Sequence, residues 1–309
     1  MRVLAVGVTA LLLLGACSEG GRQESAESAA YTIAFVTHET PGDTFWNIVR
    51  AGADQAAKDV GVEVRHSNDP DAGKQATLIQ QAVDAEVQGI ATTLVTPDAL
   101  AGSVKAATTA GIPVVGLNAG IDRYRELGAL MYFGSDETVA GTSLGERIKA
   151  AGAKHPLCVI HQTGSVALEA RCAGLKSAVP GTENIQVNGA DDVAVTSTLQ
   201  AKLAQDPTID YVVALTAPVA LDAIKAGGTA KIVTFDLNRE TAKAVQDGTV
   251  EFAVDQQPYL QGYLAVSSLY LYLKNGNDIG GGKPVLTGPS FVDKTNIDTI
   301  LPFTEKNTR

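Results

Sequence analysis

Short runs rich in β-branched and aromatic residues alternate with Ala-rich stretches along most of the chain. This alternation is typical of repeated strand–helix units and parallel sheets, because parallel strands need a long crossover between them. At roughly 150 residues per domain, a chain of 309 residues is expected to form two domains. Ten runs occur, five in each half, and they begin near Thr32, Val62, Ile90, Val114, Leu130, Leu157, Ile185, Tyr211, Ile232 and Val250.

The stretches between these runs have helical spacing. From Phe45 to Val60, apolar and small residues recur every three or four positions, which gives a helix one face to lay on a sheet. Glycines follow several such stretches, where a left-handed residue ends a helix, at Gly61, Gly89, Gly111 and Gly152. We therefore predict an α/β protein with two similar, doubly wound parallel-sheet domains. The alternative, an eight-stranded α/β barrel, needs eight units and one closed ring, which ten runs do not favour.

The N-terminus has the pattern of an export signal. Arg2 is followed by the apolar run Val3–Leu14, which is too short to be a permanent membrane span. The end of this run, Leu14-Gly15-Ala16-Cys17, resembles the lipobox of bacterial lipoproteins, where cleavage precedes a Cys that receives a diacylglycerol. We expect residues 1–16 to be a signal peptide and residues 17–30 a lipidated Cys17 and a flexible tether. An ordinary signal peptide that happens to contain a Cys is the alternative.

Charge and composition exclude several classes of protein. The net charge is −10 and no basic block occurs, which argues against a nucleic-acid partner and weakly against acidic ligands. Three Cys and four scattered His show no metal-ligand spacing, so we expect no metal and no cofactor. The GxGxxG, HExxH and GxxxxGK[ST] motifs are absent, and we predict that the protein is not an enzyme.

Polar residues follow most of the apolar runs. Open parallel sheets bind ligands beyond the carboxyl ends of their strands, so a ligand site is expected among these residues. Asn and Asp are also common in loops for reasons of turn geometry alone, and the pattern therefore carries more weight than any member. The set comprises His38, Asp43, Asn68, Asp69, Thr96, Asp98, Asn118, Ser135, Asp136, Gln162, Asp191, Asp192, Thr216, Asp236 and Gln256.

Several segments resemble known proteins in order along residues 31 to 300. They are IAFVTHETPGDTFWNIVRAGADQAAKDVGVEV, TPDALAGSVKAATTAGIPVVGLNAG, TGSVALEARCAGL, IVTFD and DQQPYLQG. They resemble the periplasmic-binding-protein type I superfamily, and most of all the ribose- and simple-sugar-binding proteins of ABC importers. The resemblance implies two domains joined by a three-crossing hinge, with crossings near Gly134-Ser135, Gln256-Gln257 and Leu286-Thr287. Residues 31–134 plus 257–286 would form one domain, and residues 135–256 plus 287–309 the other.

The resemblance also implies ligand-binding residues. Phe45 and Trp46 match an aromatic pair that stacks on a sugar ring, although Phe45 also fits the buried face of its helix. Trp46 lies one position off the apolar spacing and is expected to face the cleft. Asp43 matches a polar position before the pair, in a loop two residues longer than the ribose-binding pattern; His38 and Glu39 are further candidates there.

In the second half, Arg171 matches a sugar-binding Arg whose planar donors suit adjacent hydroxyls. Asp236 matches a carboxylate that accepts from two hydroxyls, and Gln256 matches a polar residue beside the hinge.

Two of the matched positions depart from the ribose-type pattern. Asn118 stands where those proteins carry an Asp followed by an Arg, and here the next residue is Ala119. Thr216 stands where an Asn is typical. Because one carboxylate and one guanidinium are lost, the ligand is expected not to be ribose; a different pentose, a hexose, a polyol or a cyclitol remain open.

Cys158 and Cys172 lie fourteen residues apart, on a predicted strand and helix. In an exported protein they can form a disulfide, and equally they can be two small buried residues. The spacing and context favour the bridge. His66, His155 and His161 are interpreted as ordinary polar residues at the ends of strands or helices.

Together these features predict an extracytoplasmic solute-binding protein, lipid-anchored to the cell membrane. It would capture a small carbohydrate-like ligand (a sugar, polyol or cyclitol) and present it to an ABC permease, acting as a monomer. A ligand-sensing or quorum-signal-binding protein coupled to a membrane receptor is the alternative. A sugar-responsive transcription regulator would need a DNA-binding motif before residue 31, where the export signal lies.

The lipobox generates the first prediction. We expect the mature chain to begin at an acylated Cys17 and to partition with membranes, whereas the Cys17→Ala variant is released or left unprocessed. A diacylglyceryl group with a further acyl chain exceeds the two-chain requirement for stable anchoring. Mass spectrometry of the mature N-terminus measures this, and an unmodified terminus downstream of Cys17 contradicts it.

Overall fold

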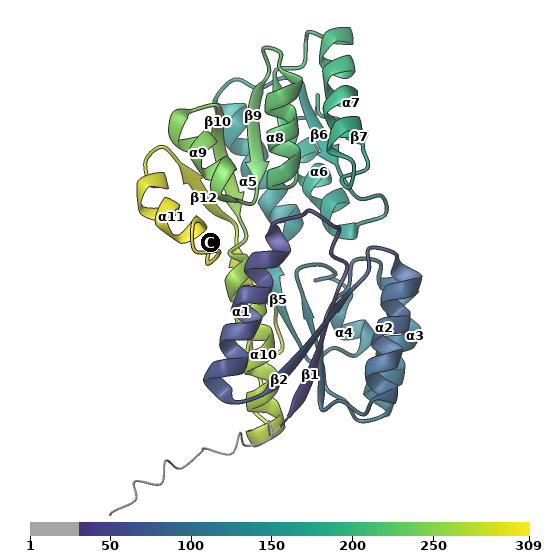
Figure 1. Ribbon diagram of the computed structural model, residues 1–309. Helices are drawn as coiled ribbons and strands as arrows, with labels where there is room; N and C mark the ends of the chain where they lie inside the picture. The colour runs from purple at the N-terminus through teal and green to yellow at the C-terminus, as the bar shows by residue number, and fades with distance from the viewer. Residues whose placement is uncertain (1–30) are drawn as a thin grey trace, which may run out of the picture.

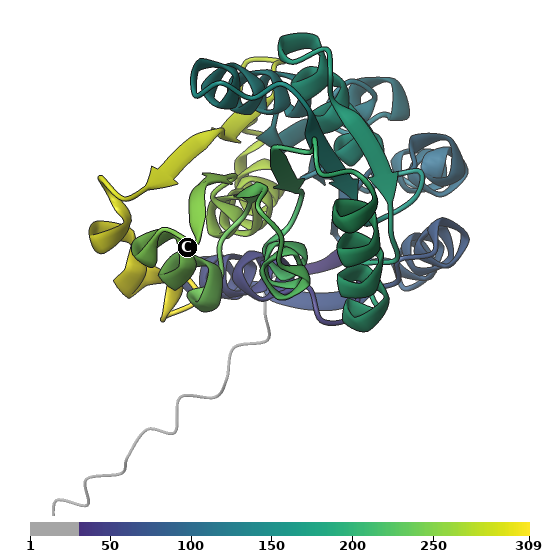
Figure 2. The ribbon, with the colours of Figure 1, turned by 90° about the horizontal axis from the view of Figure 1, so that it is seen from above.

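The computed structural model describes residues 31–309, so the predictions for the signal peptide, the tether and Cys17 lie outside the described residues. This part of the chain forms two stacked lobes, each with a sheet covered by helices on both faces (Figures 1 and 2). Within residues 31–309 no helix has the length and apolar character required to cross a membrane.

Each lobe is built on a six-stranded sheet. In the first lobe the strand order is β11-β5-β4-β3-β1-β2, and all pairs are parallel. In the second lobe the order is β12-β10-β9-β8-β6-β7, and only the edge strand β12 is antiparallel to its neighbour. The strands are β1 (Thr32–Thr37), β2 (Glu63–Asn68), β3 (Gly89–Thr93), β4 (Val114–Leu117), β5 (Met131–Ser135), β6 (Pro156–Ile160), β7 (Glu183–Gln186), β8 (Tyr211–Ala214), β9 (Lys231–Phe235), β10 (Val250–Asp255), β11 (Val285–Gly288) and β12 (Ser290–Asp293).

Helices connect the strands and cover both faces of each sheet, so the central strands are buried on both sides and consist of nearly continuous apolar residues. Each sheet therefore has two buried clusters, one per face. The helices are α1 (Phe45–Val60), α2 (Ala72–Asp84), α3 (Pro97–Thr109), α4 (Tyr124–Leu127), α5 (Glu137–Ala150), α6 (Val166–Ala178), α7 (Asp192–Gln205), α8 (Ala217–Ala226), α9 (Arg239–Asp247), α10 (Pro258–Asn275) and α11 (Ile297–Thr304).

Two helix pairs pack unusually closely because glycines lie at the contact. In α1 and α10, which run side by side in Figure 1, a Cβ on Gly52 would lie 2.0 Å from the Tyr259 carbonyl oxygen. In α5 and α6, a Cβ on Gly141 would lie 2.1 Å from the Arg171 carbonyl oxygen, and one on Gly174 would lie 2.3 Å from that of Thr138. Only glycine permits these backbones to approach so closely.

The ten predicted strands are confirmed as β1 to β10, each beginning within two residues of its expected position. The structure adds β11 and β12, whose four residues each are too short for a clear alternating pattern. One of the glycine predictions is wrong. The left-handed residue after α2 is Glu86, whereas Gly89 is the first residue of β3, where its Cα faces the Leu269 side chain of α10.

The chain passes between the sheets three times. The first passage follows Ser135 at the end of β5, so Ser135 belongs to the first sheet and not to the second lobe as expected from the sequence. The second passage lies between β10 and α10, around Gln256-Gln257. The third lies at Pro289, between β11 and β12, so Thr287 and Gly288 belong to the first sheet and not to the second lobe as expected from the sequence. Thr287 is held there because its carbonyl accepts a 2.7 Å hydrogen bond from the Gln257 side chain.

The C-terminal segment returns to the junction between the lobes (Figure 1). There the guanidinium of Arg309 pairs with Asp255, a buried carboxylate at the end of β10. Asp255 also accepts a hydrogen bond of 2.7 Å from the backbone N–H of Gln257. These contacts order the second passage between the lobes.

Cys158 of β6 and Cys172 of α6 are joined in a disulfide, with their Cα atoms 5.9 Å apart. Both residues are fully buried between the sheet and the helix that carries Arg171. The structure thus favours the bridge over two separate buried thiols.

The disulfide generates the second prediction. Replacing both cysteines, Cys158→Ala with Cys172→Ala, should lower the free energy of unfolding by about 3 kcal/mol, because the bridge restricts a loop of about fifteen residues in the unfolded chain. Urea unfolding of the two forms measures this difference. A thiol-labelling reagent applied to the denatured wild-type lobes without reductant gives a direct test. If Cys158 and Cys172 are both labelled, they are not bridged.

Candidate ligand-binding cleft

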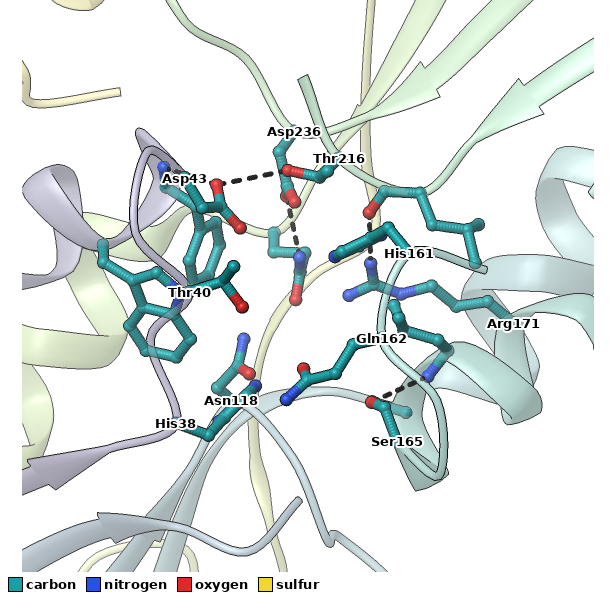
Figure 3. A pocket seen from close by; sticks show the side chains of 16 residues that line it. His38, Thr40, Asp43, Asn118, His161, Gln162, Ser165, Arg171, Thr216 and Asp236 are labelled. Carbon is teal, nitrogen blue, oxygen red and sulfur yellow. Dashed lines mark hydrogen bonds between the residues drawn. The ribbon is translucent and has the colours of Figure 1, made fainter. Parts of the chain in front are cut away.

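A cavity lies between the lobes, where the carboxyl ends of the two sheets face each other (Figure 3). The space without protein atoms measures about 430 Å³ when the adjoining open solvent is included. It is lined by His38, Thr40, Asp43, Phe45, Trp46, Asn118, His161, Gln162, Ser165, Ala167, Leu168, Arg171, Leu215, Thr216, Asp236 and Gln256. All eight residues that the sequence singled out for ligand binding are among them, and they come from both lobes. We refer to this space as the deep cavity.

Two of these residues have the same left-handed backbone conformation at equivalent places in the two lobes. Asn118 follows β4 and Asp236 follows β9, and both have a φ of 65°. Asn and Asp tolerate this left-handed conformation better than other side chains. It turns the chain directly after the strand, while each backbone N–H still bonds a neighbouring strand, at Phe133 and Val254 respectively. Both side chains are thereby placed at the wall of the deep cavity.

Arg171 is the cation of the site and is only 4% exposed. Its Nε donates to Glu137 Oε2 at 2.5 Å, and one terminal nitrogen donates to the Leu215 carbonyl at 3.0 Å. The guanidinium also lies 4.3 Å from the centre of the Phe235 ring. Because a guanidinium has five N–H donors, others remain for a ligand.

Asp236 and Gln256 form a second polar pair. Gln256 donates from its amide nitrogen to Asp236 at 2.7 Å, and its amide oxygen is enclosed without a partner among the described residues. Burial raises the pKa of Asp236 well above its usual value, while nearby Arg171 opposes this shift. A ligand hydroxyl that donates to this carboxylate would replace part of the lost hydration.

Contacts across the cleft hold the lobes together beside the deep cavity. The Thr216 hydroxyl of the second lobe donates to Asp43 of the first at 3.2 Å, as Figure 3 shows. Burial raises the pKa of Asp43, and its bonds to Phe45 and Thr216 oppose the shift. Elsewhere on the interface the Val166 N–H donates to the Val95 carbonyl at 3.3 Å.

Aromatic rings form one wall of the deep cavity. Phe45 and Trp46 both line it, and both also belong to the buried cluster beneath α1. Their ring centres are 5.0 Å apart in an edge-to-face arrangement, and the His38 ring meets Trp46 in the same way at 4.9 Å. The two roles considered for Phe45, core and cavity wall, are therefore combined in one side chain.

The bonds around His38 fix its tautomer. Thr93 Oγ1 accepts from the His38 backbone N–H at 3.2 Å and from the Gln75 amide at 3.0 Å. Its own hydrogen is then left for His38 Nδ1, 2.7 Å away. Nδ1 is consequently the acceptor, and Nε2 carries the ring hydrogen. His38 can therefore offer a neutral N–H donor to a ligand.

Several lining residues were not singled out as ligand-binding from the sequence. His38 was an open candidate, Gln162 was one polar residue among many, and Thr40 and Ser165 went unnoticed. His161, interpreted from the sequence as an ordinary polar residue at the end of a strand, does follow β6, and it also lines the deep cavity. Its position directly after β6, at a carboxyl end, was the available signal. Burial lowers the pKa of His161 to about 3, with a further contribution from Arg171.

One cluster outside the cleft has the donor atoms of a metal site. Ligand atoms of His155, Glu183 and Asp206 lie within 4.8 Å of one another. The Lys202 ammonium is 2.8 Å from Glu183 and 4.0 Å from Asp206, and it already supplies the positive charge that these carboxylates attract. The cluster is therefore explained as an ion-pair network.

A cavity between two lobes, lined by polar side chains from both lobes and by an aromatic wall, is typical of a two-lobed solute-binding protein. Residues 33–278 match the model of the family described as periplasmic binding protein domain. The chain belongs to this family of extracytoplasmic, ligand-binding transport proteins.

Individual relatives agree with this assignment. A carbohydrate transporter from Acidothermus cellulolyticus, solved in complex with myo-inositol, is 52% identical with a TM-score of 0.89, over 90% of this chain and 99% of that one. A periplasmic sugar-binding protein of an ABC sugar transporter from Legionella pneumophila is 25% identical with a TM-score of 0.77, over 84% of this chain and 99% of that one. The xylose/arabinose-binding protein of Sulfolobus acidocaldarius is 26% identical, over 89% of this chain and 74% of its own. The resemblance to sugar-binding proteins of ABC transporters is thereby confirmed.

The third prediction concerns His38, whose burial, together with His161 and Arg171, lowers its pKa to about 3. An unfolded His has a pKa of about 6.5, so between these values the unfolded chain binds a proton that the folded chain does not. The free energy of unfolding is therefore highest above pH 6.5 and decreases as the pH falls below that value. When the pH is lowered from 8 to 5, the free energy of unfolding of the wild type should decrease by about 2 kcal/mol more than that of His38→Gln.

Urea unfolding at the two pH values measures this difference. Equal losses for His38→Gln and the wild type would contradict the prediction.

Proposed function

We propose that this protein captures a cyclitol, with myo-inositol as the reference ligand, and delivers it to the permease of an ABC importer. The observation that carries the proposal is the uncharged pair Asn118-Ala119 at the cleft, where ribose-type proteins carry an Asp and an Arg. The relative that is 52% identical, and that was solved with myo-inositol, supports the same ligand class.

The chemistry of the deep cavity suits a ring with a hydroxyl on every carbon. Asp236 and the Gln256 amide oxygen are acceptors, and Arg171 and His38 are donors, so the equatorial rim of such a ring would be bonded from both lobes. The C–H face of the ring would lie against the Phe45 and Trp46 wall. Each of the eight residues predicted from the sequence keeps a role as cavity lining in this proposal.

Ligand capture would couple to closure of the lobes. We assign residues 31–135 with 257–288 to the first domain and residues 136–256 with 290–309 to the second, joined at the three passages described above. A ligand bonded to Arg171 and Asp236 on one side and to His38 on the other contacts both domains, so it stabilises the closed arrangement over the open one.

We further propose how the protein acts and where it is held. The protein acts by binding alone, without catalysis, and as a monomer anchored at the membrane through Cys17. The apolar contact between the lobes is small, formed by Val95, Ala119 and Ala167, which is consistent with lobes that separate to admit the ligand.

The fourth prediction is a ligand screen by thermal shift of residues 31–309. At about 100 times its Kd, myo-inositol should add about 2.7 kcal/mol of apparent stability and ribose much less. Asp236→Ala and Arg171→Ala should each weaken binding by at least about 2 kcal/mol, because truncation leaves buried polar partners unpaired.

The exposed residues Asp278 and Arg239 provide matched controls, and Asp278→Ala and Arg239→Ala should bind as the wild type does. A shift with amino acids or nucleosides and none with cyclitols or sugars would refute the ligand class. Normal binding by both cleft variants would refute the site.

A further inference from the structure

The deep cavity continues outward into a groove between the lobes. Thr40 and His161 line the deep cavity and both parts of this groove. Pro41 and Pro70 of the first lobe and Gln186, Asn188 and Ala190 of the second line it further out. We refer to this outer space as the vestibule. It adjoins the deep cavity through these shared residues and is partly open to solvent.

The vestibule is open even though the lobes touch beside the deep cavity. The bonds Thr216–Asp43 and Val166–Val95 already join the lobes. The vestibule lies toward the edge strands β2 and β7, farthest from the three passages of the hinge. The space is therefore present in an arrangement in which the lobes are in contact, and it is not the result of separated lobes alone.

The size of the vestibule permits a second ring. With open solvent included in each value, the deep cavity measures about 430 Å³, and the two parts of the vestibule about 1020 and 790 Å³. Both parts of the vestibule offer more room than the deep cavity and are partly open to solvent, so a hexopyranose substituent would meet no steric barrier there.

The charge of the vestibule selects against an anionic substituent. Its described lining includes Asp43, Asp191 and Asp192 and contains no Lys or Arg. The N-terminus of α7 lies here, but Asp191 already caps it by accepting from the Ala194 N–H at 3.0 Å. A phosphate would meet three carboxylates without a cation, whereas a neutral sugar can donate hydroxyl hydrogens to them.

His161 provides a polar atom at the junction of the two spaces. Its Nδ1 is enclosed, with no hydrogen-bond partner among residues 31–309. The same side chain lines the deep cavity and the vestibule. An enclosed polar atom without a partner costs stability, which favours a ligand group or water here.

We propose that the protein binds cyclitols carrying one neutral glycosyl substituent, with the cyclitol in the deep cavity and the sugar in the vestibule. This inference rests on the proposed cyclitol-binding function. It extends the ligand class from a free ring to a glycoside and excludes the phosphate ester of the same ring.

Isothermal titration of the full chain in detergent tests the inference. The probes are myo-inositol, its 1-O-α-D-galactosyl and 5-O-α-D-glucosyl glycosides, and myo-inositol 1-phosphate. At least one glycoside should bind as tightly as myo-inositol or more tightly, and the phosphate at least tenfold more weakly. Ala190→Trp should fill the vestibule, weakening the glycoside at least tenfold while changing myo-inositol less than threefold. Ala201→Trp, at an exposed position near the far end of α7, is the control and should change neither.

The outcomes separate the two proposals. If myo-inositol binds and neither glycoside does, this inference is overturned and the proposed function stands. If no cyclitol probe binds, both fall. If the phosphate binds as tightly as the free ring, the selection by charge is wrong. If Ala190→Trp weakens the glycoside and myo-inositol equally, or weakens neither, the sugar does not occupy the vestibule.

Discussion

The close contact between α5 and α6 determines where the positive charge of the cleft lies. Glycines at positions 141 and 174 let the two helix backbones meet, and the Arg171 carbonyl lies at that contact. Glu137 at the start of α5 is thereby within 2.5 Å of the Arg171 guanidinium. Burial raises the pKa of Glu137, and the guanidinium opposes that shift. A side chain at either glycine would force the helices apart and displace the cation from the Asp236 side of the cavity.

The polar groups of the cleft are only partly satisfied by one another. Arg171 donates two hydrogen bonds to the protein and keeps further donors for a ligand, and Gln256 donates one and keeps its amide oxygen as a free acceptor among the described residues. This arrangement fixes the side chains in position before a ligand arrives, so little side-chain entropy is lost on binding. It also makes the empty cavity less stable than the filled one, because buried polar atoms without partners cost free energy.

The parallel strands were predictable because burial on both faces leaves nearly continuous apolar runs, and the site was predictable because the carboxyl ends of such strands meet between the lobes. The sequence could not show that Gln75 and Thr93 orient His38. These residues are far apart in the chain, and their side chains meet only in the folded lobe. A glycine after a helix suggested a cap, but Gly89 begins β3 and lies close to the Leu269 side chain, a contact that the sequence did not show. The position of β11 was missed because a four-residue edge strand carries little pattern.

The first lobe is assembled from both ends of the chain. Its buried cluster combines Ile33 and Val49 with Ala265 and Leu269 of α10, and its edge strand β11 begins only at Val285. During synthesis the ribosome therefore releases more than two hundred residues before this core can close, including every strand of the second lobe except β12. Domains normally fold in the order of their synthesis. Here the segment that is made first shares its core with one that is made almost last, so the core of the first lobe cannot be completed before α10 is available.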